Sequence, residues 1–243
     1  MATKLGSVVG YRSGIYNGYK VIGTQTLGLR GLVLWLKFNE GSGNIAYDSS
    51  FYNNHGTIYG ATWTDGKFGK ALSFDGVDDY VDCGNDTSLR PSRITYEAWF
   101  KANSVSGRYT ILRGSHNGDV ALCIEDGAVK GQIDADPSNP TWNFVSYSPI
   151  YENIWYHAVL TWDGTYARLY VNGELKDTDS THPGDIRWSD TDGTIIGMSR
   201  PSSLQYPFNG TIDEVRIYNR ALSENEIKML YYNRIGAVPS KTI

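Results

Sequence analysis

The fold of this chain is decided by one stretch, Asn209-Gly-Thr-Ile-Asp-Glu-Val-Arg-Ile-Tyr-Asn-Arg-Ala-Leu222, which we predict to be a late strand of a β-sheet. Successive side chains of a strand point to opposite faces, so Val215 and Ile217 share one face. Counting back by two puts Asp213 on that apolar face, where an ionised carboxylate is costly unless it is paired, hydrogen-bonded or bound to a cation. Alternatively, a β-bulge between Ile212 and Val215 would turn Asp213 back to solvent.

A short helix is predicted to follow this strand directly. Ser223-Glu224-Asn225-Glu226 fits a capping box, in which the first and last side chains satisfy backbone N–H groups of the helix start. Leu222 and Ile227 flank the box at the spacing of a hydrophobic staple. We therefore expect a helix from about Glu224 to Tyr232.

Three stretches together resemble the laminin-G-like, concanavalin A-like domains. The closing stretch is Asp213-Glu-Val-Arg-Ile-Tyr-Asn-Arg-Ala-Leu-Ser223, followed by the short helix. The opening one is Leu34-Trp-Leu-Lys-Phe-Asn-Glu-Gly-Ser-Gly43, continuing through residues 46–50, and the second signature is Gly69-Lys-Ala-Leu-Ser-Phe-Asp-Gly76 with residues 79–81. The resemblance covers roughly residues 31–232 and implies a concanavalin A-like jelly roll. It does not decide function, because lectins, adhesion modules, glycosidases and structural domains share this fold.

Other segments also alternate with the period of a strand. The sets that share a face are Leu32, Leu34, Leu36 and Phe38; Ile94, Tyr96, Ala98 and Phe100; and Tyr156, Ala158, Leu160 and Trp162. Asp126-Gly127, Asp163-Gly164 and Asn172-Gly173 are pairs that favour tight hairpins, so residues 155–176 are predicted to form a three-stranded meander. The sequence predicts an all-β protein, an antiparallel β-sandwich with one short helix near its end.

Composition limits the classes of function. The chain has 243 residues, of which 40% are hydrophobic, and this suits one large all-β domain. The net charge of −4 does not indicate a basic surface for binding nucleic acid. No apolar run approaches transmembrane length, so no membrane insertion is expected. Cys83 and Cys123 form either one disulfide or two buried thiols.

We predict three parts: an extended glycine-rich arm (residues 1–30), the sandwich (31–235) and a tail (236–243). The arm contains apolar residues such as Val8, Val9 and Tyr11, too many for a solvated spacer. It is expected to pack on its own domain, on another subunit of a homo-oligomer or on a capsid-like assembly; the alternative is a linker ordered only by lattice contact. Residues 1–10 lack the apolar run of a secretory signal. An excised extracellular domain, a cytoplasmic protein and a virion component acting outside the cell remain as explanations.

Catalysis is not expected from the sequence. Glycosidic hydrolysis normally uses two carboxylates about 5–10 Å apart, and some enzymes of this fold place them on one strand as Glu-x-Asp-x-Glu, which this chain lacks. Asp213 and Glu214 are adjacent and point to opposite faces, while Asp177 and Asp179 lack a third acid. There is also no Gly-x-Ser-x-Gly elbow.

Calcium binding is a hypothesis with three named ligands. Ca²⁺ takes six to eight oxygen ligands, which loops rich in Asp, Asn and Gly supply. The resemblance implies a structural calcium near the meeting of early and late strands, and Asp213, Asp75 and Asp48 are the acids of its three signatures. The alternative for each acid is a turn cap.

A glycan site is predicted around residues 134–151. Sugars stack on aromatic rings and hydrogen-bond to polar side chains, and this segment joins both kinds of group. The predicted residues are Trp142, Tyr147, Tyr151, Asp134, Asp136 and Asn139. Trp188 and Tyr206 are further aromatic candidates outside it. The alternative for any one aromatic residue is packing in the sheet.

The sequence therefore favours a non-catalytic binding or adhesion module that recognises a cell-surface or polysaccharide glycan. The second hypothesis is a decoration protein of a virion or other assembly, docked through residues 1–30 and displaying the sandwich outward. A glycoside hydrolase is the third.

Overall fold

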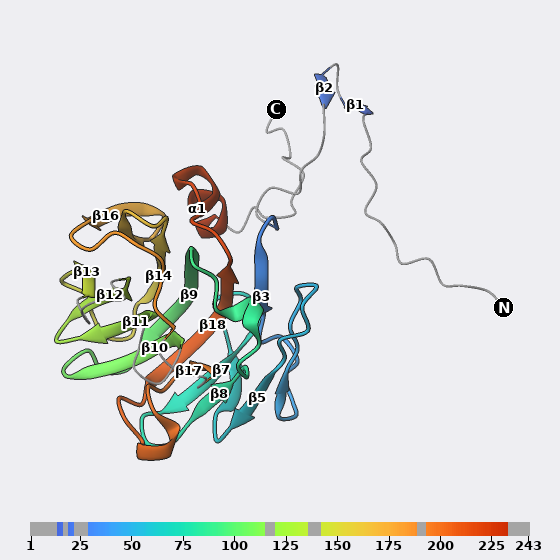
Figure 1. Cartoon of the computed structure of the whole chain (residues 1–243). Helices are drawn as coiled ribbons and strands as arrows, with labels where there is room; N and C mark the ends of the chain where they lie inside the picture. The colour runs from blue at the N-terminus through green and yellow to red at the C-terminus, as the bar shows by residue number, and fades with distance from the viewer. Residues whose placement is uncertain are drawn as a thin grey trace.

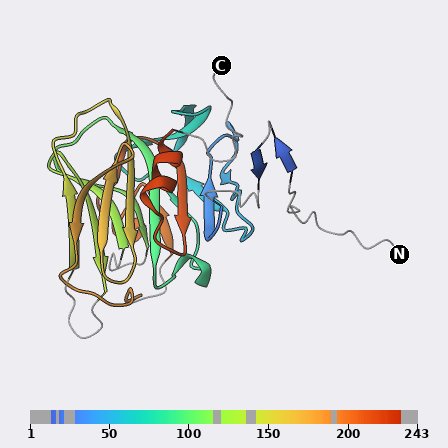
Figure 2. The ribbon, with the colours of Figure 1, turned by 90° about the horizontal axis from the view of Figure 1, so that it is seen from above.

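The computed structural model describes residues 29–114, 120–135, 142–188 and 193–232, and the backbone of a short hairpin, β1 (Gly14–Tyr16) and β2 (Tyr19–Val21). Two antiparallel sheets form a sandwich, with one helix beside it (Figures 1 and 2). The predicted fold class is thus confirmed. The rest of the predicted arm and the tail 236–243 lie outside the described residues. In the described part of the chain, no helix has the length and apolarity to cross a membrane.

We call the first sheet the groove sheet. Its strands follow the order β13-β12-β11-β10-β17-β8-β5-β4. Their bounds are β4 Ile45–Ala46, β5 Gly56–Tyr59, β8 Tyr80–Asp82, β10 Arg108–Gly114, β11 Val120–Glu125, β12 Ala128–Asp134, β13 Trp142–Tyr147 and β17 Thr194–Ile196. Strand β13 is one edge of this sheet.

The second sheet, which we call the helix sheet, has the order β16-β15-β14-β9-β18-β7-β6, and β3 also pairs with β18. Its strands are β3 Leu32–Leu36, β6 Thr62–Asp65, β7 Lys70–Asp75, β9 Ile94–Ala102, β14 Trp155–Trp162, β15 Ala167–Val171, β16 Glu174–Asp179 and β18 Asn209–Tyr218. The predicted meander is β14-β15-β16. Two short 3₁₀ helices, η1 (Thr87–Leu89) and η2 (Pro201–Ser203), lie in connections.

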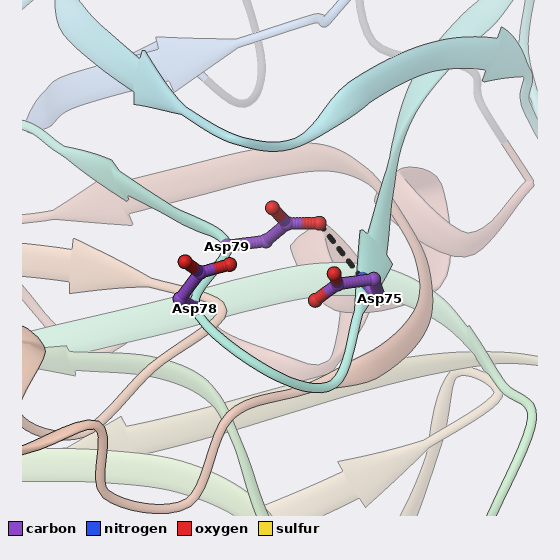
Figure 3. Close-up of side chains that lie close together, drawn as sticks. All are labelled: Asp75, Asp78 and Asp79. Atoms are coloured by element: carbon purple, nitrogen blue, oxygen red, sulfur yellow. Dashed lines mark hydrogen bonds between the residues drawn. The ribbon is translucent and has the colours of Figure 1, made fainter.

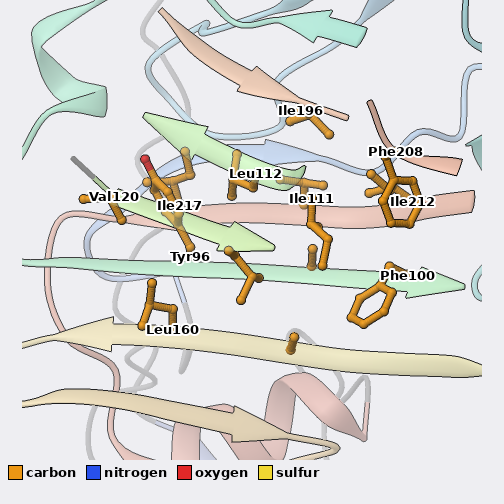
Figure 4. Close-up of a cluster of buried hydrophobic side chains, with 14 of the residues drawn as sticks. Tyr96, Phe100, Ile111, Leu112, Val120, Leu160, Ile196, Phe208, Ile212 and Ile217 are labelled. Carbon is orange, nitrogen blue, oxygen red and sulfur yellow. The ribbon is translucent and has the colours of Figure 1, made fainter. Parts of the chain in front are cut away.

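The hydrophobic core fills the space between the sheets. Figure 4 shows side chains of both sheets meeting there, including Phe100 and Ile212 of the helix sheet and Leu112 of the groove sheet. The rings of Phe100 and Phe208 meet edge to face, with centroids 6.3 Å apart. The alternating sets predicted on Ile94–Ala102 and Trp155–Trp162 are members of this core, which confirms the strand period found in the sequence. Cys83 and Cys123 are separate buried thiols.

Two of the three predicted tight hairpins are observed. Asp126-Gly127 and Asn172-Gly173 each join two strands directly, with all four residues at positive φ. Asp163-Gly164 instead belongs to a longer loop, residues 163–166, between β14 and β15. The Asp163 Oδ1 atom accepts the backbone N–H groups of Thr165 at 2.9 Å and Tyr166 at 2.8 Å, so the carboxylate caps the wider turn.

The predicted helix is α1 (Glu224–Tyr231), and it begins with the predicted capping box. Ser223 Oγ accepts the N–H of Glu226, and a Glu226 carboxylate oxygen accepts the N–H of Ser223 at 2.9 Å. Leu222 and Ile227 belong with Leu230 to a second, smaller apolar cluster on the outer face of the helix sheet. Apolar burial therefore attaches α1 to that face.

A buried ionic cluster lies on the same outer face. Arg216 Nη1 donates to both carboxylate oxygens of Glu97 at 2.9 Å, and Arg216 Nη2 donates to Glu214. His157 Nε2 lies 3.0 Å from Glu97 Oε1, and the Trp35 indole N–H donates to Glu214 at 2.9 Å. Burial alone would raise the pKa of Glu97, but the Arg216 charge and the hydrogen bond to His157 hold it below its ordinary value.

Strand β18 contains the β-bulge that the sequence left as the alternative. Asp213 pairs with Trp99 and Arg216 with Glu97, so two residues of β18 oppose one residue of β9 between these pairs. Glu214 adopts a φ of 52° within the bulge. The bulge turns Asp213 to the outer face, away from Val215, but Asp213 is fully buried there rather than solvated.

Candidate functional site

A groove of about 410 Å³ crosses the outer face of the groove sheet over strands β10 to β13. One side is aromatic, the other comes from the connection before β18, and the floor has small side chains. The lining residues are Arg108, Thr110, Arg113, Ala121, Cys123, Gln132, Trp142, Phe144, Ser199, Arg200, Gln205 and Tyr206. The groove therefore joins parts of the chain that are almost 100 residues apart.

The aromatic side consists of Trp142 and Phe144 on the edge strand β13. They are two residues apart and therefore share a face; their ring centroids are 6.4 Å apart, and 56% of Phe144 is exposed. Strand β16 of the opposite sheet holds this edge. Asp179 Oδ2 accepts the N–H of Phe144 at 2.9 Å, and Asp177 Oδ2 accepts the N–H of Ser146 at 2.8 Å. These two acids thus have a structural role beside the groove.

The rest of the lining carries charged and hydrogen-bonding groups. The Arg108 guanidinium lies 4.8 Å from the ring centroid of Tyr206, and its Nη2 donates to Gln132 Oε1 at 2.9 Å. Arg113 Nη1 donates to Ser199 Oγ at 2.9 Å. These contacts hold the arginine side chains along the groove.

A second β-bulge gives Arg113 its direction. Thr110 pairs with Cys123 and Leu112 with Leu122, which leaves Ile111 as the extra residue of β10. Ile111 and Leu112 both face the core, so the alternation is shifted by one residue after the bulge. Simple counting by two from Arg108 would place Arg113 in the core; the bulge instead places it in the groove.

The floor consists of Thr110, Ala121 and Cys123. Their small side chains leave the space that larger residues at these positions would fill. Burial raises the pKa of the Cys123 thiol to about 11, so the thiol is neutral at physiological pH. Flat aromatic faces, guanidinium groups, an amide and hydroxyl groups around a shallow groove are chemistry that can hold a sugar ring by stacking and hydrogen bonding.

The predicted glycan residues do not form one site in the described chain. Trp142 lies in the groove, but Asp134 is fully buried, and its Oδ2 accepts hydrogen bonds from Arg187 Nε at 3.0 Å and Nη2 at 2.5 Å. Tyr147 lies beneath Lys176 Nζ, 5.1 Å from the ring centroid. Tyr151 is 59% exposed, outside the groove. Asp136 and Asn139 lie outside the described residues.

Sequence reasoning missed most of the groove. Arg108, Arg113, Gln132 and Phe144 were not among the predicted binding residues. A signal was present for Gln132 and Phe144, because both alternate with buried neighbours on their strands. Which residues lie beside them in the sheet depends on the cross-strand register, which the sequence does not specify.

Acidic residues gather at a different place, the turn after β7. Ligand oxygens of Asp75, Asp78 and Asp79 lie within 4.8 Å of one another (Figure 3). Asp79 Oδ2 accepts the N–H of Asp75 at 2.8 Å, and burial raises the pKa of Asp79. The carboxylates supply hard oxygens of the type Ca²⁺ prefers, though fewer than its usual six to eight. Of the three predicted ligands, this group contains Asp75 and includes neither Asp48 nor Asp213.

Asp48 caps a loop instead. Its carboxylate accepts the N–H groups of Trp35 at 2.8 Å, Ser50 at 2.8 Å and Asn54 at 2.9 Å, and the Ser50 hydroxyl at 2.6 Å. These bonds join the loop after β4 to strand β3. The arrangement is the turn-cap alternative considered for each acid, and it occupies both carboxylate oxygens.

We expect Asp48→Ala to lower the free energy of unfolding by about 2–3 kcal/mol, because three backbone donors and a hydroxyl group lose a charged acceptor at once. Urea denaturation in the presence of Ca²⁺ and of chelator measures the loss. Glu152→Ala, which removes an exposed carboxylate outside the acidic turn, is the control. A loss seen only with Ca²⁺ would contradict the capping role and favour a metal ligand.

Asp213 occupies a third environment. Its Oδ2 atom accepts the N–H of Phe68 at 2.9 Å, and a Cβ at Gly66 would lie 2.7 Å from this oxygen, so glycine allows the loop to close over the carboxylate. Within the described structure, nothing donates a hydrogen bond to the buried Oδ1. Burial, with the nearby Glu214 charge, raises the pKa of Asp213 to about 7.

A family model for the concanavalin A-like lectin/glucanases superfamily matches residues 75–228, more than half of the chain. The chain belongs to this superfamily. Its curated relatives include human adhesion G-protein coupled receptor D1, 24% identical over 133 residues, and human pappalysin-1, 24% identical over 187 residues. These matches cover 54% and 69% of this chain but only 14% and 11% of the relatives. The chain therefore corresponds to a small part of either protein.

Solved structures share the superfamily fold. Domain 4 of AbnA, a GH43 extracellular arabinanase from Geobacillus stearothermophilus in complex with arabinotriose, is similar with a TM-score of 0.62 at 20% identity, covering 82% of this chain and 98% of that one. The binding domain of Paraclostridial Mosquitocidal Protein 1 is similar with a TM-score of 0.67 at 18% identity, covering 84% of this chain and 52% of that one. The botulinum neurotoxin serotype D binding domain is similar with a TM-score of 0.61 at 19% identity, and the match covers the same shares of the two chains. At these identities the likeness establishes the fold alone.

Proposed function

We propose that this chain is a non-catalytic binding module that recognises a glycan, and that the groove over strands β10–β13 holds the sugar. The observation that carries the proposal is the aromatic pair of half-buried Trp142 and exposed Phe144, which lines one shallow groove together with Arg108, Gln132 and Tyr206. Stacking on the rings would bind the sugar face, and the polar side chains would bind its hydroxyl groups.

The superfamily relatives support a binding role. A domain of an arabinanase in complex with arabinotriose, toxin binding domains and an adhesion receptor all contain similar domains. We infer that the partner of this chain is a glycan of a cell surface or polysaccharide. Their substrates and receptors do not transfer at this distance, so the identity of the sugar rests on the groove itself.

The chemistry of the groove supports a non-catalytic binding function. Hydrolysis by the common mechanism needs an acid and a base or nucleophile on either side of the scissile bond. The described lining offers arginines, amides, hydroxyl groups and aromatic rings, which bind sugars without cleaving them.

Replacing Trp142 by alanine should weaken glycan binding at least tenfold, because the variant loses the larger stacking surface of the aromatic side. Binding is measured on an array of plant, bacterial and animal glycans, followed by calorimetry with the best ligand. Tyr151→Ala is the matched control, because it removes an exposed aromatic ring outside the groove. Equal loss in both variants, or loss only in the control, would refute this location.

A further inference from the structure

We propose that the groove selects acidic oligosaccharides, which carry carboxylate or sulfate groups, over neutral ones. This inference rests on the proposed glycan-binding function and adds the class of ligand. Arg108, Arg113 and Arg200 contribute three guanidinium groups, and no carboxylate belongs to the described lining of the groove.

The chemistry of guanidinium favours an anionic ligand. A guanidinium has five N–H donors in a planar fork, so the partly exposed Arg108 can keep its contact with Gln132 and still present donors to a carboxylate or sulfate. Such charge-assisted hydrogen bonds are stronger than those to a neutral hydroxyl group. A neutral sugar would gain only the weaker kind.

Arg108 is the best placed of the three. A third of its side chain is exposed (33%), while the bond to Gln132 and the contact with Tyr206 fix its direction. Glu125 lies 4.0 Å from Arg108 Nη1 and is itself bonded at 2.6 Å to Lys130. The positive charge near the groove therefore exceeds what Glu125 balances among these residues.

The arginine also lies beside the aromatic side. Gln132 accepts the hydrogen bond from Arg108 and is the cross-strand partner of Phe144. A sugar stacked on Phe144 would therefore direct one edge toward the Gln132–Arg108 pair. An acidic substituent on that edge would meet the guanidinium group, which gives the selectivity a geometric basis.

A second cavity of about 380 Å³, by contrast, has balanced charge. It is lined by Tyr147, Tyr231 and Tyr232 together with Lys176 and Lys228. Lys176 pairs with Glu174 at 2.7 Å, and Lys228 pairs with Glu224. Aromatic residues occur in both cavities, but only the groove is lined by Arg108, whose neighbouring Glu125 is shared with Lys130, so selectivity for acidic sugars is assigned to the groove.

The test is calorimetry on the full chain with matched pairs of probes: trigalacturonic acid and its methyl ester, heparin hexasaccharide and its desulfated form, and 3′-sialyllactose and lactose. We expect at least one acidic probe to bind about tenfold or more tightly than its neutral counterpart, with the preference decreasing as salt rises. Arg108→Gln, which keeps an amide donor without the charge, should abolish the preference. Lys176→Gln, in the second cavity, should retain it.

The outcomes separate the two proposals. Neutral probes that bind as tightly as acidic ones, with binding lost in Trp142→Ala, would overturn the acidic preference and leave the glycan-binding function standing. An acidic preference unchanged in both Arg108→Gln and Arg200→Gln would also overturn the inference, because another surface would then be responsible. No binding of any probe, acidic or neutral, would overturn both proposals. Thermal melting of each variant shows whether it is folded.

Discussion

Replacing Glu97 by alanine should lower the free energy of unfolding by about 3–5 kcal/mol, the range typical of breaking a buried ion pair. Glu97 is fully buried and accepts both hydrogen bonds of Arg216 Nη1. Without Glu97, the buried Arg216 guanidinium keeps only Glu214 as an anionic partner, and His157 loses the acceptor of its Nε2. The free-energy cost of removing the guanidinium from water is then poorly compensated.

Urea denaturation at neutral pH measures this loss. Glu174→Ala is the control, because it breaks an exposed pair with Lys176 and should cost less than about 1 kcal/mol. A loss below about 1 kcal/mol in Glu97→Ala would show that the cluster is solvated in solution and does not hold the outer face of the helix sheet together.

The second large effect has the opposite sign: Asp213→Asn should raise the free energy of unfolding at pH 8 by about 2–4 kcal/mol. The pKa of Asp213 is raised to about 7 from an ordinary value of 3.8, a difference of about three pH units at about 1.4 kcal/mol each. Between these values the native state holds a proton that the unfolded state has released, so stability falls as pH rises. Asparagine keeps the acceptor for Phe68 N–H but cannot ionise.

The pH profile provides the test. The gain in the free energy of unfolding of Asp213→Asn over the parent should be near zero below about pH 4, grow between about pH 4 and 7, and stay constant above about pH 7. Denaturation curves at pH 4, 6 and 8 measure it. Asp213→Asn being less stable than the parent at pH 8 in the presence of Ca²⁺ would contradict this account and support the predicted metal role of Asp213.

The repeating features of the fold could be predicted from the sequence. Alternation along residues 94–100 and 156–162 identified core strands correctly, and Ser223 with Glu226 identified the start of α1. Such features depend on local periodicity and on groups a few residues apart. The resemblance in three stretches added the family, which the match over residues 75–228 confirms.

The site was harder to predict because it depends on irregularities and on long-range register. The bulges at Ile111 and Glu214 each shift the alternation, and nothing in the sequence marks their positions unambiguously. The groove joins β13 to residues 199–206, a neighbourhood created only when the sheet assembles. Trp142 was identified because an aromatic residue in a polar segment is a local signal in the sequence. Arg108 gives no such signal, because its role depends on its contacts with Gln132 and Tyr206, which are distant in the sequence.

Chemical-shift mapping of the ¹⁵N-labelled chain with its best glycan tests the central claim most directly. The account predicts the largest changes at the indole N–H of Trp142, the side chains of Arg108 and Gln132 and the backbone of Phe144, all around the groove. Changes confined to Tyr231 and Tyr232 in the second cavity, or to the turn of Asp75 and Asp79, would contradict it, because the sugar would then bind elsewhere on the sandwich.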